Sequence, residues 1–170
     1  VSPRKIDQIK PIFNLEGPVR INSGNPKKQL QMMALAYQHD IPIESITTKD
    51  LKEIDSTALN VIVHKASQFS DKVIVSDSSL DVEGAKVGVN LKWMISKLDR
   101  FVGKKATLTT LLAYKEKTGT NEQVLVFRGQ RKGVLVSPRG PSQKGCPLNR
   151  YFQPNGSCKT LAERGGREFD

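Results

Sequence analysis

Short apolar segments in the first half of the chain predict the strands of an α/β fold. Residues 18–21 and 73–75 are apolar runs typical of buried strands. Residues 41–47 alternate apolar and polar side chains, which predicts a third strand. The run at 73–75 is followed by polar residues 76–79, so we expect it to deliver these side chains to a sheet edge.

Apolar residues between these strands recur at helical spacing and predict three helices. The helices cover residues 27–39, a segment that begins at Ser56, and residues 91–101. The side chains expected to face the core are Leu30, Met33, Ala34 and Tyr37 in the first helix, and Ala58, Val61, Ile62, Ala66 and Phe69 in the second.

The second half of the chain changes to the strand period. Residues 106–114, 123–128 and 133–136 read as strands, joined by turns at 115–121 and 129–132, which predicts consecutive β-hairpins. The order of elements therefore predicts an α/β fold, with a central mixed β-sheet flanked by helices and a second lobe rich in β-hairpins.

The chain has 170 residues, which is the size of one ordinary domain. We expect a single domain over residues 1–170, with its core in 17–140. The segment 141–170 is rich in Gly and Pro and is predicted to be loop or partly disordered.

Charge and cysteine content narrow the class of protein. The net charge of +10 favours an acidic partner, such as a phosphorylated small molecule, nucleic acid or an anionic surface. Aromatic residues make up 6% of the chain, so no stacking platform for single-stranded nucleic acid is apparent. Cys146 and Cys158 form no disulfide framework, and no apolar run is long enough to span a membrane. We expect a cytoplasmic protein without a membrane partner; because the chain begins with Val1, an organellar location stays open.

The segment from Ser23 to Lys28 is the strongest candidate for a phosphate site. Ser23, Gly24 and Asn25 suit a turn or helix N-cap, and Pro26 suits the first helical position. A helix N-terminus attracts anions, and Lys28 lies one turn further on. An ordinary structural cap would explain the same residues.

Two carboxylates near such a turn would suggest magnesium. Glu53 and Asp77 are the candidates, because Mg²⁺ prefers one or two carboxylates together with phosphate oxygens. Lys28, Lys65 and Lys92 are candidates for neutralising the remaining phosphate charge.

The order of these motifs resembles the inosine triphosphate pyrophosphatase (ITPase) family, over about residues 18–164. The matching segments are Ser-Gly-Asn-Pro-Lys-Lys at 23–28, Asp-Leu-Lys-Glu at 50–53 with Lys65 twelve positions later, the strand and its Ser-Asp-Ser-Ser-Leu at 73–80, Leu-Lys-Trp-Met at 91–94, Phe-Arg-Gly at 127–129, Gly-Val-Leu-Val-Ser-Pro-Arg-Gly at 133–140 and Phe-Gln-Pro-Asn-Gly at 152–156.

The resemblance implies an ITPase-like fold, a homodimer, and Mg²⁺-dependent hydrolysis of non-canonical purine nucleoside triphosphates (ITP, dITP or XTP) to monophosphate and pyrophosphate. It implies that Asp77 and Lys28 are catalytic and that Glu53 and Asp77 hold the metal. It also implies phosphate binding by a set of five residues: Ser23, Asn25, Lys28, Lys65 and Lys92.

The base-binding half of the motif series departs from the family. Leu148 and Asn149 stand at the base-binding positions, where the family has an aromatic residue and an aspartate. The family's Ser-His-Arg motif does not follow Thr-Leu-Ala-Glu at 160–163, and Ser76 replaces the first acid of its Glu-Asp pair. Base discrimination is therefore predicted to be weak or lost.

Two functions fit these observations. The first is the family activity, at full or at reduced efficiency. The second is a catalytically inactive ITPase-like protein that acts as a binding or structural subunit, for example with RNA in a ribonucleoprotein, as the charge and the altered base site would allow.

Overall fold

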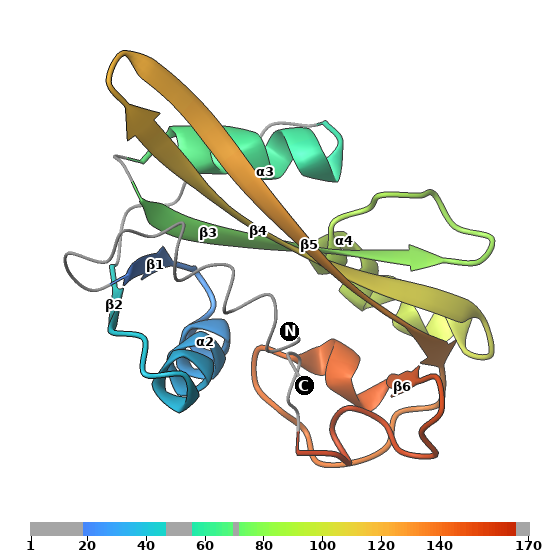
Figure 1. Cartoon of the computed structure of the whole chain (residues 1–170). Helices are drawn as coiled ribbons and strands as arrows, with labels where there is room; N and C mark the ends of the chain where they lie inside the picture. Colours follow the sequence, from blue (N-terminus) through green and yellow to red (C-terminus); the bar gives the residue numbers. More distant parts are fainter. Residues whose placement is uncertain (1–18, 47–55, 70–71, 166–170) are drawn as a thin grey trace. The chain divides into compact units, whose positions relative to one another are not determined.

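A computed structural model describes residues 19–46, 56–69 and 72–165. The described parts of Val1–Ser76 and Leu111–Phe127 form one compact unit, and those of Asp77–Thr110 and Arg128–Asp170 form a second. The strands are β1 (Val19–Asn22), β2 (Ile43–Ser45), β3 (Val73–Val82), β4 (Lys105–Thr118), β5 (Asn121–Leu135) and β6 (Phe152–Pro154) (Figure 1). The helices are α2 (Pro26–Gln38), α3 (Ala58–Ser67) and α4 (Leu91–Met94), with the 3₁₀ helices η1 (Ile95–Phe101) and η2 (Pro147–Arg150).

The six strands form one mixed sheet in the order β2-β1-β3-β4-β5-β6. β1 runs parallel to both β2 and β3, whereas β5 and β6 are antiparallel. The predicted α/β fold with a mixed sheet and flanking helices is confirmed.

Helix α3 covers one face of the sheet in the first unit. Val61, Ile62 and Ala66 of this helix are buried, as is Phe69 just beyond it. Ile62, Ala66 and Phe69 pack in a cluster with residues of β3 and β4. Thr57 caps the helix by accepting a hydrogen bond from the Asn60 N–H at 3.3 Å. The sequence-based prediction for this helix is confirmed, although its N-cap lies one residue after Ser56.

The prediction for the buried face of α2 was wrong. Leu30 is 66% exposed and Tyr37 is 85% exposed, and Ala36 is the residue of α2 that is fully buried. The inward face runs through Gln29, Met32 and Ala36, each one position before a residue that the pattern had placed in the core. One residue is a rotation of about 100°, so the helix presents its more apolar stripe outward.

Two strands are longer than predicted. β3 continues from Val73 to Val82, so the polar residues 76–79 lie within a strand and not in a loop at its end. β5 is continuous from Asn121 to Leu135, so the turn predicted at 129–132 does not exist. The second half therefore contains one long hairpin, β4 to β5, with its turn at Gly119 and Thr120 (Figure 1).

The described residues after Pro138 are mostly loop, as predicted, but they are packed and ordered. Leu148, Phe152 and Leu161 are 0–3% exposed and join the core of the second unit with Leu80, Leu98 and Leu135. β6 pairs with β5, with Leu135 opposite Phe152. Buried apolar residues far apart in sequence therefore stabilise a segment that has no periodic pattern.

The third predicted helix is confirmed but changes geometry within its length. Its first turn, Leu91–Met94, is α-helical, and Ile95–Phe101 is a 3₁₀ helix. Met94 and Leu98 are buried in the core, which fixes which side of the segment faces outward. Cys146 and Cys158 are not joined in a disulfide. Within the described ranges, no helix is long and apolar enough to cross a membrane.

Candidate functional site

The predicted phosphate turn is held by hydrogen bonds between residues close in sequence. Asn25 is the N-cap of α2, and its Oδ1 accepts from the Lys27 N–H at 3.0 Å. Ser23 Oγ accepts from the Asn25 N–H at 3.2 Å. Gln29 Nε2 donates to the Ser23 carbonyl oxygen at 2.6 Å. The turn is thus fixed at the positive end of a 13-residue helix.

Lys28 and Lys65, the predicted phosphate-binding lysines of the first unit, lie at opposite ends of their helices. Lys28 is half-buried in the first turn of α2, one turn from the cap. Lys65 is half-buried in the last turn of α3, where a cation also complements the negative end of the helix dipole. Lys28 thus lies close to the turn in sequence, whereas Lys65 belongs to a different element.

A buried hydroxyl lies on the strand next to the turn. Asn22, the last residue of β1, pairs with Val75 of the parallel strand β3. Ser23 and Ser76 are the residues that follow this pair. Ser76 Oγ is buried and has no hydrogen-bond partner among the described residues. An unpaired buried hydroxyl costs about 1–3 kcal/mol, so Ser76 would be stabilised by a polar ligand or water at this position.

Asp77, the first residue of the second unit, is held by an asparagine. Asn90 Nδ2 donates to Asp77 Oδ1 at 2.8 Å. The segment before α4 runs beside β3, with a bridge between Ser79 and Asn90 and a hydrogen bond from Leu80 N to the Val89 carbonyl. Asn90 also caps α4 by accepting from Lys92 N at 3.1 Å. Asn90 therefore orients the Asp77 carboxylate. The sequence analysis missed this contact; the available signal was an asparagine directly before a helix.

The donor set for a metal contains one described carboxylate. Asp77 is a half-buried oxygen ligand of the kind that Mg²⁺ prefers. Glu53, the other predicted ligand, lies outside the described residues. Among the residues that are described, no group of three His, Cys, Asp or Glu side chains is placed to hold a metal ion. A hydrated ion shared between one or two carboxylates and substrate phosphate fits such a set, because Mg²⁺ keeps several of its waters.

Lys92 lies exposed in the first turn of α4. Its Nζ is 5.3 Å from the centroid of the Trp93 ring, within the range of a cation–π contact. Lys92 and Asp77 are both linked to Asn90, one through its backbone and the other through its side chain.

The predicted base-binding positions are inside the second unit. Leu148 is 3% exposed and packs in the core, and Asn149 is 4% exposed. Asn149 Nδ2 donates to Gln143 Oε1 at 2.7 Å, and its carbonyl accepts from Ala162 N at 2.7 Å. These groups of Asn149 therefore bond to the chain itself.

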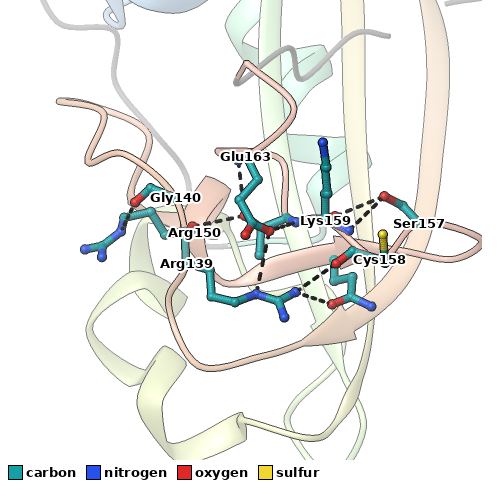
Figure 2. Close-up of polar contacts among 9 residues, drawn as sticks. Arg139, Gly140, Arg150, Ser157, Cys158, Lys159 and Glu163 are labelled. Carbon is teal, nitrogen blue, oxygen red and sulfur yellow. Dashed lines mark hydrogen bonds and ion pairs between the residues drawn. The ribbon is translucent and has the colours of Figure 1, made fainter.

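A network around Arg139 fixes the neighbouring loops (Figure 2). Arg139 Nη2 donates to Gln153 Oε1 at 2.5 Å and to the Cys158 carbonyl at 3.3 Å, and its Nε lies 3.6 Å from Glu163 Oε2. Thr160 and Glu163 bond reciprocally through side chain and backbone, as in a capping box. Thr160 Oγ1 also donates to the Arg139 carbonyl. These contacts are internal, so we assign the network a structural role.

Comparison with known proteins places the chain in a family. The model of the Ham1 family matches residues 19–168. A protein named inosine triphosphate pyrophosphatase from Yarrowia lipolytica is 33% identical over 129 residues, which cover 67% of this chain and 66% of the relative. Proteins of the same name from Scheffersomyces stipitis and Candida albicans are 31% and 30% identical, and the matches cover 67% of this chain and 64% and 62% of those relatives.

The chain thus spans slightly less than two thirds of the length of the curated relatives it matches. The family model, in contrast, covers nearly all of the residues that form the two units. The resemblance drawn from the motif series is confirmed, and this chain belongs to the Ham1 family.

Proposed function

We propose that this protein is a Mg²⁺-dependent nucleoside triphosphate pyrophosphatase that hydrolyses non-canonical purine nucleoside triphosphates to monophosphate and pyrophosphate. The proposal rests on membership of the Ham1 family and on relatives named inosine triphosphate pyrophosphatase. The structural observation that carries it is the pre-formed turn at the N-terminus of α2, with the unpartnered Ser76 hydroxyl on the adjacent strand.

The residues predicted for the phosphate and metal side each have a role in this proposal. Ser23, Asn25 and Lys28 bind phosphate oxygens, because hydroxyl, amide and ammonium groups can all donate to them. Lys65 and Lys92 balance further phosphate charge. In the reaction, a water oxygen attacks the α-phosphorus, the bond from that phosphorus to the bridging oxygen breaks, and pyrophosphate leaves.

Asp77 is the proposed metal ligand and helps to orient the attacking water, with Glu53 as a second ligand. A bound Mg²⁺ would supply charge neutralisation at the phosphates and acidify a water molecule. The hydrogen bond from Asn90 holds one oxygen of the Asp77 carboxylate in place, so that the carboxylate does not need to reorganise.

The burial of Leu148 and Asn149 supports a weak preference among bases. A site that hydrogen-bonds its substrate gains selectivity from the polar groups it presents. Asn149 instead donates to Gln143, and Leu148 fills the core. The same observation favours the second candidate function, a family member that binds a partner without efficient catalysis. Homodimer formation is a further proposal that follows from the family resemblance.

A pyrophosphate-release assay tests the proposal. The protein is incubated with ITP, dITP, XTP or ATP, with and without Mg²⁺, and pyrophosphate is measured. We expect Mg²⁺-dependent release, and a loss of about 100-fold or more in Asp77→Asn. This variant keeps an oxygen that can accept from Asn90, so its melting temperature should match that of the wild type.

Asp40→Asn is the matched control, since it removes the same charge from an exposed position. Asp40 has a φ of 53°, which asparagine tolerates as well as aspartate. This variant should keep wild-type turnover. A wild-type protein that releases no pyrophosphate from any of the four nucleotides would exclude the enzymatic proposal and leave the binding function.

A further inference from the structure

The chain contains one tryptophan, and it lies on the surface. Trp93 is 65% exposed in the first turn of α4, although tryptophan usually buries most of its area. Its neighbours Met94 and Leu98 are buried, so the α4–η1 segment has a well-defined inner side and Trp93 lies on the outer side. Core packing does not account for an indole in this position.

The outer side of this segment is cationic. Lys92, Lys97 and Arg100 are exposed on the same α4–η1 segment as Trp93. Residues 86–105 contain six Lys and Arg and one acid, Asp99. The Asp99 carboxylate accepts a hydrogen bond from the Tyr151 hydroxyl at 2.8 Å. We call Lys92, Trp93, Lys97 and Arg100 the Trp93 surface.

The charge of the whole chain is concentrated in the unit that carries this surface. The ranges Asp77–Thr110 and Arg128–Asp170 contain 15 Lys and Arg against 7 Asp and Glu, a net +8 of the total +10. The other unit is close to neutral. A polyanion would therefore be attracted to the second unit in particular.

The combination of an exposed aromatic ring and surrounding cations indicates the class of ligand. Bases stack on aromatic side chains while cations contact the phosphates, and this pairing is sequence-tolerant because every base has a π-face. Trp93 and Lys97 are four residues apart where the α-helix passes into the 3₁₀ helix, so they are separated by about 6–8 Å along the axis and can contact adjacent parts of one strand. Lys92 lies over one face of the indole, and the opposite face is the one that a base would use.

We propose that the Trp93 surface binds single-stranded nucleic acid, with one base stacked on Trp93 and phosphates contacted by Lys97 and Arg100. A duplex would keep its bases inside the helix and would not use the ring. Of the Trp93 surface, Lys92 alone also has a role in the pyrophosphatase proposal. The site goes beyond that proposal, because Trp93, Lys97 and Arg100 have no role in the reaction.

The single tryptophan makes the test direct. Trp93 fluorescence is followed while U₂₀ RNA or dT₂₀ DNA is added in EDTA, which excludes any Mg²⁺-dependent nucleotide site. We expect quenching by at least one oligonucleotide, and comparison of the two identifies RNA or DNA as the better ligand. UMP at the same nucleotide concentration should quench much less, since it brings one phosphate instead of many.

Variants separate stacking from charge, with binding measured by anisotropy of a labelled oligonucleotide. Trp93→Ala should weaken binding about ten-fold or more, and Trp93→Phe should weaken it less. Lys97→Gln and Arg100→Gln should each lower the slope of log affinity against log salt by roughly 0.7. Lys117→Gln removes the same charge from the other unit, where Lys117 pairs with Glu122, and should change the slope little.

Several results would overturn the proposal. The first is that neither oligonucleotide quenches Trp93 fluorescence up to about 100 µM, the weak end of non-specific binding. The second is that Trp93→Ala and the wild type bind the oligonucleotide with equal affinity. Quenching by anionic phospholipid vesicles alone would assign the surface to membranes. A change of oligomeric state in Trp93→Ala without oligonucleotide binding would make it a protein interface. Asp77→Asn should bind oligonucleotides normally, so this test is independent of the pyrophosphatase proposal.

Discussion

Replacing Gly133 with alanine should break the contact between β5 and β6. Gly133 is buried in β5, opposite Pro154 of β6. A Cβ atom at this position would overlap the backbone oxygen of Gln153 and would lie 2.9 Å from Phe152 Cζ and 3.0 Å from the Gln153 carbonyl carbon. Because two of these atoms belong to the backbone of the partner strand, a rotamer change cannot relieve the overlap.

The expected loss of stability in Gly133→Ala follows from the part of the structure that must move. Overpacking a core usually costs about 1–3 kcal/mol when side chains can adjust. Here β6 has to shift, and Phe152, which is completely buried, shifts with it. We therefore expect a destabilisation of about 3 kcal/mol, close to the cost of losing a buried aromatic side chain. For a chain of this size, this lowers the melting temperature by roughly 6–12 °C.

Gly129→Ala is the matched control on the same strand. A Cβ at Gly129 would meet no atom within 4 Å, and the backbone there is not left-handed. This variant should differ from the wild type by less than about 0.5 kcal/mol, or be slightly more stable because alanine restricts the unfolded chain. Urea unfolding followed by circular dichroism measures both variants. Equal stability of Gly133→Ala and Gly129→Ala would refute the assigned β5–β6 packing.

Two further substitutions test packing and electrostatics. Ile62→Ala, at a completely buried position of α3, should lower the free energy of unfolding in urea by about 2–5 kcal/mol. Leu59→Ala, at a 54% exposed position of the same helix, should lower it by less than about 1 kcal/mol. Similar losses in the two variants would contradict the orientation of α3. The hydrogen bond to Asp99 raises the pKa of Tyr151 above its ordinary value near 10, with smaller contributions from burial and from the Asp99 charge. Because the raised pKa belongs to the folded state, the stabilisation is complete below about pH 10 and is lost as the pH rises through the folded-state pKa. Tyr151→Phe should therefore be less stable by about 0.5–1 kcal/mol at pH 7 and 9, with a smaller deficit at higher pH; a deficit that grows with pH would contradict the assignment.

Local signals in the sequence were sufficient to predict the turn at Ser23–Asn25 and the helix that follows it. Ser23, Asn25 and Pro26 form their contacts within a few residues of one another, so residue type alone predicted the cap and the start of α2. The α3 prediction held for the same reason, because its apolar stripe has a single consistent face.

The errors arose where distant partners decide the structure. In α2 the spacing of Leu30 and Tyr37 predicted an amphipathic helix correctly, but spacing does not say which side meets the sheet. In β5, the polar and glycine residues at 129–132 resemble a turn, yet the strand continues through them. Pairing with β4 stabilises the strand conformation of these residues, and a hydrogen bond from Gln130 Nε2 to Thr109 Oγ1 at 3.2 Å contributes to it.

The base-binding positions illustrate the same limit at the level of function. The sequence identified Asn149 as a departure from the family, but its consequence depends on residues before and after it in the chain. Its side chain donates to Gln143, its carbonyl accepts from Ala162, and it is 4% exposed. Turning this side chain outward toward a ligand would break its hydrogen bond to Gln143, which costs free energy. Asn149 is thus held within the fold of the second unit by partners that a sequence pattern alone does not identify.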